Sequence, residues 1–217
     1  MKKFYAILII FVCFTFTACK KSVFVPDPDN GLLPAYSETG TNIAGALLND
    51  TAWRCQQHPC FTCVLWRFFV SSSISGDSTV FVFAGKYTPT SVQYVDSYYR
   101  NVSTYFYFVV KGLRIENQDS LMKLNNKTFR LDLANGYCGI SFDPFRMDNR
   151  GRGTLEIDKV QKKSWEFGSG TPDNPKAYGF NLSGHFNFTT TLDRDYKVTD
   201  GRFDMHVNQD SNFDISD

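Results

Sequence analysis

The chain has 217 residues, of which 42% are hydrophobic and 16% aromatic, and its 23 Lys and Arg residues nearly balance its 22 Asp and Glu residues. This balance disfavours a general nucleic-acid-binding protein, and the many aromatic residues exclude an intrinsically disordered chain. The length suits one globular domain with short appendages, large enough to bury a core without disulfide bonds.

The first 18 residues have the layout of a secretory signal peptide. Lys2 and Lys3 precede an uncharged, mostly apolar run over residues 4–18. That run is too short for a transmembrane helix, which needs about twenty apolar residues. A basic start, an apolar middle and small residues at the end are typical of a signal for export.

The residues that end this signal resemble the lipobox of bacterial lipoproteins, in which a Cys is lipidated and becomes the first residue of the mature protein. The run is Phe16-Thr17-Ala18-Cys19, and it departs from the usual pattern at Phe16, where Leu or Val is common. We therefore expect a signal peptide over residues 1–18 and a lipid on Cys19, which attaches the protein stably to a membrane because more than one acyl chain is added.

The residues after Cys19 favour one membrane and one side of it. Lys20 is not the Asp that commonly retains lipoproteins in the inner membrane of proteobacteria, so we expect the outer membrane. Residues 20–22 lack the acidic run associated with surface display, which favours the periplasmic side of the cell envelope.

The segment over residues 19–43 is predicted to be a flexible tether. Pro26, Pro28 and Pro34, together with Asp, Asn and Gly residues between them, disfavour both a helix and the interior of a sheet. Residues 209–217 are mostly polar and are predicted to be a disordered tail.

Between these segments, residues 44–208 alternate apolar and polar side chains with a period of two, which is typical of half-buried strands. We expect strands near 44–54, 63–72, 79–85, 91–96, 102–110, 128–133, 136–142, 153–158, 163–167, 178–188 and 202–207. Only residues 117–124 predict a short helix, and 63–70 and 79–84 are apolar on both faces, as in central strands. The fold class is therefore all-β: one antiparallel β-sandwich or barrel-like domain of roughly nine to eleven strands.

Two local signals concern the turns and bends of these strands. Asn49-Asp50 lies between Leu48 and Trp53 and suits a hairpin turn. Asp200-Gly201 lies inside a strand pattern and predicts a bulge or a tight bend.

Four cysteines remain after the anchor, namely Cys55, Cys60, Cys63 and Cys138. In an oxidising compartment such thiols usually pair, so we predict at least one disulfide bond, and the sequence leaves the pairing open. The bridge would contribute on the order of 2–4 kcal/mol.

The same cysteines also match, in spacing, the ligands of plant-type iron–sulfur ferredoxins. The loop between Cys55 and Cys60 holds Gln56, Gln57, His58 and Pro59 in place of the small residues that a cluster needs, and the chain has no twin-arginine signal. Zinc bound by these cysteines and His58 fits by ligand type, but thiols in an oxidising compartment usually pair first. Cys60 and Cys63 form a C-x-x-C motif, as in redox proteins, but that motif runs into a strand instead of opening a helix. We therefore expect no cofactor, no metal and no redox site.

Two other groups of side chains are candidates for function. His185, Asp204 and His206 share the polar faces of two strands and would meet if these strands pair, although solvated polar residues are the favoured interpretation. A dense tyrosine group is a candidate ligand or partner surface, although filling of a second core layer is the favoured interpretation: Tyr94, Tyr98, Tyr99, Tyr105 and Tyr107.

Two stretches resemble a group of uncharacterised Bacteroidota lipoproteins with a β-rich exported body. These are residues 40–53 (GTNIAGALLNDTAW), similar to the opening of that group, and residues 182–188 (LSGHFNF) with 198–204 (VTDGRFD), similar to its closing hairpin. The resemblance implies export and the limits of the domain, and it implies no activity and no site residues.

The sequence thus predicts a lipid-anchored β domain that binds an envelope ligand or protein partner, or has a structural role, without catalysis. The alternative is an envelope enzyme that acts on glycan or peptidoglycan, for which Asp143, Asp148, Glu156 and Asp158 are available carboxylates. A metal or redox protein built on the four cysteines is the third interpretation.

Overall fold

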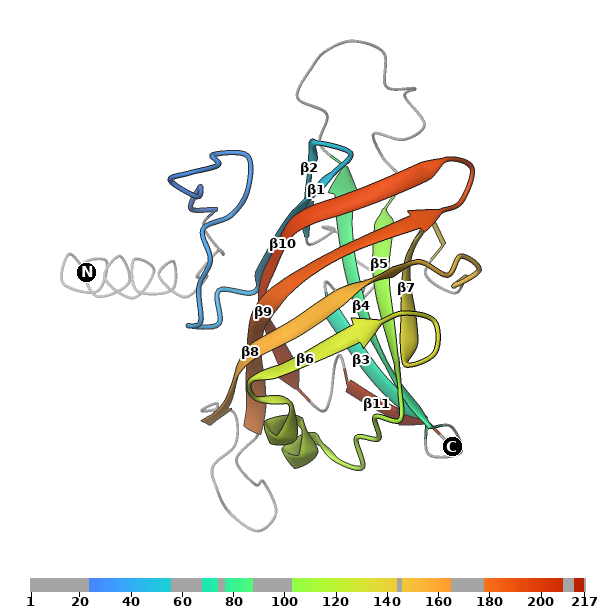
Figure 1. Ribbon diagram of the computed structural model, residues 1–217. Coiled ribbons are helices and arrows are strands. Elements are labelled where there is room, and N and C mark those ends of the chain that lie inside the picture. Colours follow the sequence, from blue (N-terminus) through green and yellow to red (C-terminus); the bar gives the residue numbers. More distant parts are fainter. Residues whose placement is uncertain are drawn as a thin grey trace, which may run out of the picture.

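The structure is a computed structural model that describes residues 24–55, 68–73, 77–87, 103–143, 146–164, 178–208 and 213–216 (Figure 1). The predicted signal peptide, Cys19, Cys60, Cys63, Tyr94, Tyr98, Tyr99 and the strand expected near 91–96 lie outside these residues. The described strands are β1 (Ile43–Leu48), β2 (Thr51–Cys55), β3 (Phe68–Ser73), β4 (Ser78–Tyr87), β5 (Thr104–Lys111), β6 (Lys127–Leu131), β7 (Gly136–Ser141), β8 (Arg152–Ser164), β9 (Tyr178–Thr191), β10 (Asp195–Asn208) and β11 (Phe213–Ser216).

The sheet curls into a nearly closed barrel. Antiparallel pairing runs from β7 through β5, β4, β2, β1, β10 and β9 to β8. An isolated bridge between Cys138 and Gly151 brings β7 to the start of β8, with the Gly151 amide donating to the Cys138 carbonyl at 2.6 Å. Strand β6 pairs with β8, and β3 pairs with β4. The prediction of an all-β, antiparallel, barrel-like domain is confirmed.

Aromatic side chains fill the interior of the barrel. The fully buried rings that belong to the core are those of Trp53, Phe68, Phe81, Phe83, Phe106, Phe108, Phe180, Phe186 and Phe203. Phe186 lies 5.4 Å from Phe83 and 5.3 Å from Phe108, centroid to centroid, in the tilted arrangements that aromatic pairs prefer. The interior is therefore a packed core with these rings at its centre.

The two expected strands at 153–158 and 163–167 are in fact parts of one strand as far as the structure describes them, since β8 continues from Arg152 to Ser164. The pairing of β8 with β9 shifts register between Ile157 and Lys159. Ile157 and Val160 are buried, so Asp158 and Lys159 both fall on the outer face. This bulge breaks the period-two pattern, which is why the sequence suggested two strands.

Both predicted local features are confirmed. Asn49 and Asp50 form the β1–β2 turn with φ of 46° and 62°, the left-handed region that a tight hairpin requires. A bulge separates Val198 from Gly201 in the pairing of β10 with β9, and Asp200, not the glycine, takes the positive φ of 52°.

The predicted short helix is a 3-10 helix, Gln118–Leu124, which lies at the lower end of the barrel in Figure 1. Asn117 caps it by accepting a hydrogen bond from the Ser120 amide at 3.0 Å. Leu121 and Leu124 are buried in the core. Among the described residues, no helix has the length and apolar character needed to cross a membrane.

The segment expected to be a flexible tether is ordered over residues 24–42, which we call the strap. It begins as a hairpin held by the Pro26–Pro34 bridge and by the Ala35 amide, which donates to the Val25 carbonyl at 2.8 Å. Asp27 accepts hydrogen bonds from the amides of Asp29 and Asn30 and so stabilises the turn. The prolines exclude a helix, as predicted, but they also restrict the chain to this compact turn.

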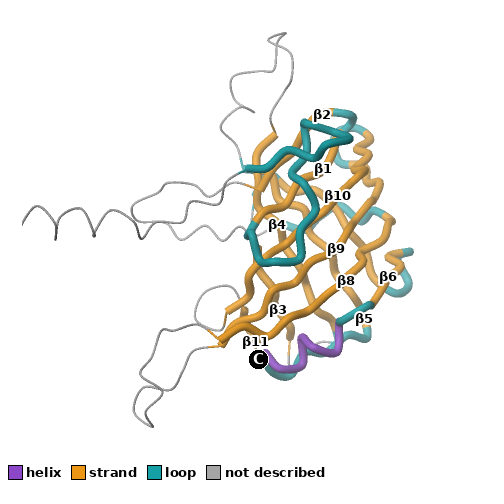
Figure 2. Tube along the Cα trace, turned by 90° about the vertical axis from the view of Figure 1, so that its left-hand side faces the viewer, coloured by secondary structure: helices purple, strands orange, loops and turns teal. Residues whose placement is uncertain are grey.

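The strap lies on the side of the barrel that faces the viewer in Figure 2. Asp204 holds its second part against the barrel. Its buried carboxylate accepts hydrogen bonds from the amides of Gly40 and Thr41, both at 2.9 Å, and from the Thr41 hydroxyl at 3.0 Å. Arg202 forms an ion pair with Asp27 in which both side chains are largely buried. These contacts give residues 24–42, which the sequence suggested to be a tether, a defined position against the barrel.

Part of the segment that the sequence suggested to be a disordered tail forms a strand. Residues Phe213–Ser216 form β11, which pairs in parallel with β3. The short alternation of Phe213, Asp214, Ile215 and Ser216 has the strand period, and the edge of β3 offers the backbone partners.

Replacing Asp204 by Ala should release the strap while leaving the barrel folded. The loss of a buried carboxylate that accepts charge-assisted hydrogen bonds should cost about 2 kcal/mol, so amide exchange over residues 36–42 should accelerate about thirtyfold. Hydrogen–deuterium exchange checks this, with Lys159→Gln as the control, because the exposed Lys159–Glu38 pair contributes at most about 1 kcal/mol. Equal exchange in both variants would contradict the role given to Asp204.

Candidate functional site

The outer face of β8, β9 and β10 carries rows of polar side chains that run across the three strands. In one row Arg152, Thr189 and Lys197 are paired neighbours, and in another Glu156, His185 and Arg202. Further along, Ser183 lies between Lys159 and Asp204. This face has two halves, one covered by the strap and one open.

The covered half contains a cluster of Tyr36, Asp158 and His185. The rings of Tyr36 and His185 stack with centroids 4.5 Å apart. One oxygen of Asp158 accepts a hydrogen bond from the Tyr36 hydroxyl at 2.9 Å and lies 2.7 Å from Nδ1 of His185. Partial burial, the largest cause, raises the pKa of Tyr36, so the phenol stays protonated and donates. The cluster joins the strap to β8 and β9.

His185, Asp204 and His206, which would meet in the less favoured interpretation, each bind a different partner. His185 pairs with Asp158, Asp204 binds the strap, and Nδ1 of His206 bonds the Asn181 side chain. Burial lowers the pKa of His206, which favours its neutral form. Within the described ranges no group of three potential metal ligands is found. The favoured interpretation as merely solvated residues was also wrong for Asp204, which is buried.

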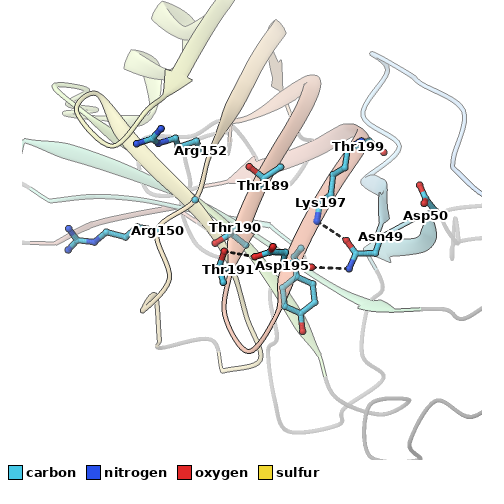
Figure 3. Close-up of a pocket in the computed structure, with 12 residues that line it drawn as sticks. Asn49, Asp50, Arg150, Arg152, Thr189, Thr190, Thr191, Asp195, Lys197 and Thr199 are labelled. Carbon is cyan, nitrogen blue, oxygen red and sulfur yellow. Dashed lines mark hydrogen bonds between the residues drawn. The ribbon is translucent and has the colours of Figure 1, made fainter.

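The open half forms a groove of about 780 Å³ beside the β1–β2 and β9–β10 turns (Figure 3). We call it the groove, and its lining residues are Asn49, Asp50, Arg150, Gly151, Arg152, Thr189, Thr190, Thr191, Asp195, Tyr196, Lys197 and Thr199. Arg150 and Arg152 stand at one side, Asn49 and Asp50 at the other, and the threonines lie between them.

Hydrogen bonds fix the walls of the groove. The Asn49 side chain accepts from the Lys197 amide at 2.7 Å and donates to the Asp195 carbonyl at 3.3 Å, which ties the β1–β2 turn to β10. The Thr191 hydroxyl donates to Asp195 at 2.8 Å. The groove is therefore built on paired strands and braced turns, a rigid support for a binding site.

The charge of the groove is mixed, with an excess of cations. The lining includes the cations Arg150, Arg152 and Lys197 and the carboxylates Asp50 and Asp195. The ion pairs found among the described residues do not involve these three cations. Arg152 and Lys197 flank the exposed Thr189, so two cationic groups and a hydroxyl lie in one row. This row can donate hydrogen bonds to an acidic, hydroxyl-bearing ligand.

The structure describes two members of the tyrosine group, Tyr105 and Tyr107, and both are buried. For these two rings the favoured interpretation, filling of a second core layer, holds and the ligand surface does not. The Tyr107 hydroxyl donates to the carbonyl and the side chain of Asn149. The Asn149 amide also pairs with the backbone of Ile140, so the segment before β8 covers the outward face of β5 and β7. For Tyr94, Tyr98 and Tyr99 the surface stays a prediction.

The cysteine prediction is corrected at one position. Cys138 is a free thiol with no exposed surface, because its side chain points into the core from β7. Burial raises its pKa to about 12. Cys55 is buried and its Sγ donates to the Ala84 carbonyl at 2.9 Å. A disulfide bond elsewhere stays a prediction, since Cys60 and Cys63 lie outside the described residues.

The carboxylates considered for glycan hydrolysis are not gathered at the groove. Asp143, Asp148, Glu156 and Asp158 are absent from its lining, and Asp158 is engaged by Tyr36 and His185.

Comparisons of the chain with protein-family models, with curated proteins and with solved structures find no match. The resemblance to Bacteroidota lipoproteins therefore rests on residues 40–53, 182–188 and 198–204 alone.

Sequence reasoning missed the groove although its signals are present. Thr189, Thr190 and Thr191 form a run at the end of a strand, and Arg150 and Arg152 share one face of an extended segment. Only the register of β8, β9 and β10 shows that the threonine run and the two arginines lie side by side.

Cys138 should resist alkylation in the folded protein. Because burial holds its pKa near 12, the reactive thiolate is scarce at pH 8, and the side chain is also inaccessible. Iodoacetamide without reductant should label Cys138 only after denaturation, as read by peptide mass spectrometry. Failure to label the denatured, non-reduced chain would place Cys138 in a disulfide bond and contradict the structure.

Proposed function

We propose that this protein is a lipid-anchored lipoprotein of the bacterial cell envelope whose barrel binds a polar, acidic ligand in the groove without catalysing a reaction. The single observation that carries the binding role is the row of Arg152, Thr189 and Lys197 on the open half of the outer face. The signal-like residues 1–18 and the lipobox-like Phe16-Thr17-Ala18-Cys19 support the anchor. The outer membrane, on its periplasmic side, is the location that residues 20–22 favour.

A ligand has to bind on the outside of the barrel. Rings such as those of Phe83, Phe106 and Phe186 occupy the interior, where a ligand-carrying barrel has its cavity. The strap covers one half of the outer face of β8–β10, and the groove is the half that stays open.

The chemistry of the groove fits an acidic glycan better than an apolar ligand. Thr189, Thr191 and Asn49 offer hydroxyl and amide groups that bond sugar hydroxyls. Arg150 and Arg152 present guanidinium groups, which pair with carboxylates in a bidentate geometry. An open groove accepts an extended chain, and wet polar contacts of this kind do not require a deep pocket.

Removing two cations from the groove should weaken binding of an acidic glycan. The double variant Arg152→Ala/Lys197→Ala should bind an oligosaccharide of galacturonic acid about tenfold more weakly, because each exposed charge contributes about 0.5–1 kcal/mol. A neutral galactose oligomer of the same length should bind more weakly than the acidic one to the unaltered protein, and added salt should reduce that preference. Isothermal titration calorimetry measures both.

The matched control is Lys123→Ala/Lys127→Ala, which removes two exposed cations outside the groove. It should leave the affinity unchanged. Equal loss in both double variants, or equal affinity for the two sugars, would refute the groove as an acidic-ligand site. Cleavage of the oligosaccharide by the protein would favour the glycan-acting enzyme instead.

Replacing Cys19 by Ala should release the protein from membranes, because the attachment point of the lipid is lost. Fractionation of cells and detection of the protein in soluble and membrane fractions checks this. Cys13→Ala is the control, since Cys13 lies inside the apolar run of the signal and that variant should stay in the membrane fraction. Membrane association of the Cys19 variant equal to that of the control would rule out the anchor.

A further inference from the structure

Three large hydrophobic side chains are exposed together on the hairpin of the strap. Phe24 is 37% exposed, Val25 57% and Leu32 39%. The other large hydrophobic residues exposed in the described part of the chain are Met122, Leu133 and Leu192, which lie singly on separate elements. We call Phe24, Val25 and Leu32 the hairpin patch.

Arg54 shows that this patch is continuous. Its guanidinium lies 3.9 Å from the centroid of the Phe24 ring. The same group donates to the Leu32 carbonyl from Nε at 2.9 Å and from Nη2 at 2.6 Å. Arg54 therefore contacts both Phe24 and Leu32, and Val25 adjoins Phe24 in the chain.

The hairpin cannot easily turn its apolar side chains inward. Leu33 is fully buried, and Pro34 is buried beside Gly45 of β1. The ion pair of Asp27 with Arg202 joins the hairpin to β10. The barrel thus presents the hairpin patch outward in a fixed orientation, although burying it would remove apolar surface from water.

The chain before the patch places it close to a membrane if the anchor exists. Phe24 is five residues after Cys19, and five residues span at most about 17 Å even when fully extended. We infer that the hairpin patch rests in the interfacial layer of the membrane that holds the lipid of Cys19, an inference that depends on the anchor proposed above.

The chemistry of the hairpin suits that layer. Phe24, Val25 and Leu32 can enter the boundary of the acyl chains, while Arg54 keeps its charge among the headgroup phosphates. Asp29 is exposed on the turn of the hairpin and limits the depth to the headgroup region, because a carboxylate is costly in the hydrocarbon core. The lipid and the hairpin patch are then two contacts that together set the orientation of the barrel on the membrane.

The test uses the full lipidated protein in vesicles of phosphatidylethanolamine and phosphatidylglycerol that contain a lipid with a headgroup nitroxide. A fluorescent amino acid at position 29 reports contact with the headgroups by quenching, and the same probe at position 192 is the control on the β9–β10 turn. We expect strong quenching at position 29 and little at position 192. In Phe24→Ser/Val25→Ser/Leu32→Ser, quenching at position 29 should fall at least twofold, while flotation with the vesicles stays complete.

The outcomes separate the two proposals. Loss of flotation of the unaltered protein would refute the lipid anchor, and the inference with it. Complete flotation with equal quenching at positions 29 and 192, or with quenching unchanged in the triple variant, would refute the membrane contact alone. Circular dichroism checks that the triple variant is folded, and Val25→Ser, at the most exposed position, gives the same test with the smallest change. A dimer of the Cys19→Ala protein that the triple variant dissociates would assign the patch to a second copy and overturn the inference.

Discussion

The filling of the barrel by aromatic side chains is the constraint on which the rest of the structure depends. Rings such as Phe83, Phe108 and Phe186 meet at the centre of the barrel at distances of 5.3–5.8 Å between centroids. Because side chains alternate across a strand, each inward ring commits its neighbours in the chain to the outer face. The long strands β8, β9 and β10 therefore present rows of polar and charged groups outward, and these rows supply both the contacts of the strap and the lining of the groove.

The bulge in β8 and the position of Asp204 determine which half of that outer face the strap covers and which half stays open. The bulge at Asp158 puts two successive side chains outside, so β8 offers Asp158 to Tyr36 and Lys159 to Glu38. Asp204 then accepts from the backbone of Gly40 and Thr41, which would otherwise lose hydrogen bonds when the strap covers the sheet. Along β9 the strap stacks Tyr36 on His185, and four residues further on Thr189 lines the open groove.

The fold class could be predicted from the sequence because the period-two pattern is local and strong. The Asn49-Asp50 turn and the Asp200-Gly201 bulge were also local, since each depends on a few residues that tolerate positive φ. The strap was not predicted because the sequence gives only local information about it. Its prolines restrict the local backbone, whereas its position depends on contacts with Asp204 and Arg202, more than 160 residues further along the chain. The sequence pattern correctly placed Tyr105 and Tyr107 on an outer face. The segment that covers Tyr107 through Asn149 follows β7 and lacks the period-two pattern, so the sequence did not predict that contact. The groove needed the register of three strands and two turns, which no local pattern contains.

An ordered strap changes what a lipid on Cys19 would do. A flexible tether of some twenty-five residues would let the barrel rotate and move several nanometres from the bilayer. With residues 24–42 bound to β8, β9 and β10, a lipid on Cys19 would hold the barrel close to the membrane surface, because Phe24 follows Cys19 by only five residues. A partner of the proposed groove would then have to be reached within that thin layer. If the anchor is present, the hydrogen bonds that stabilise the strap would also limit how far from the membrane the groove can lie.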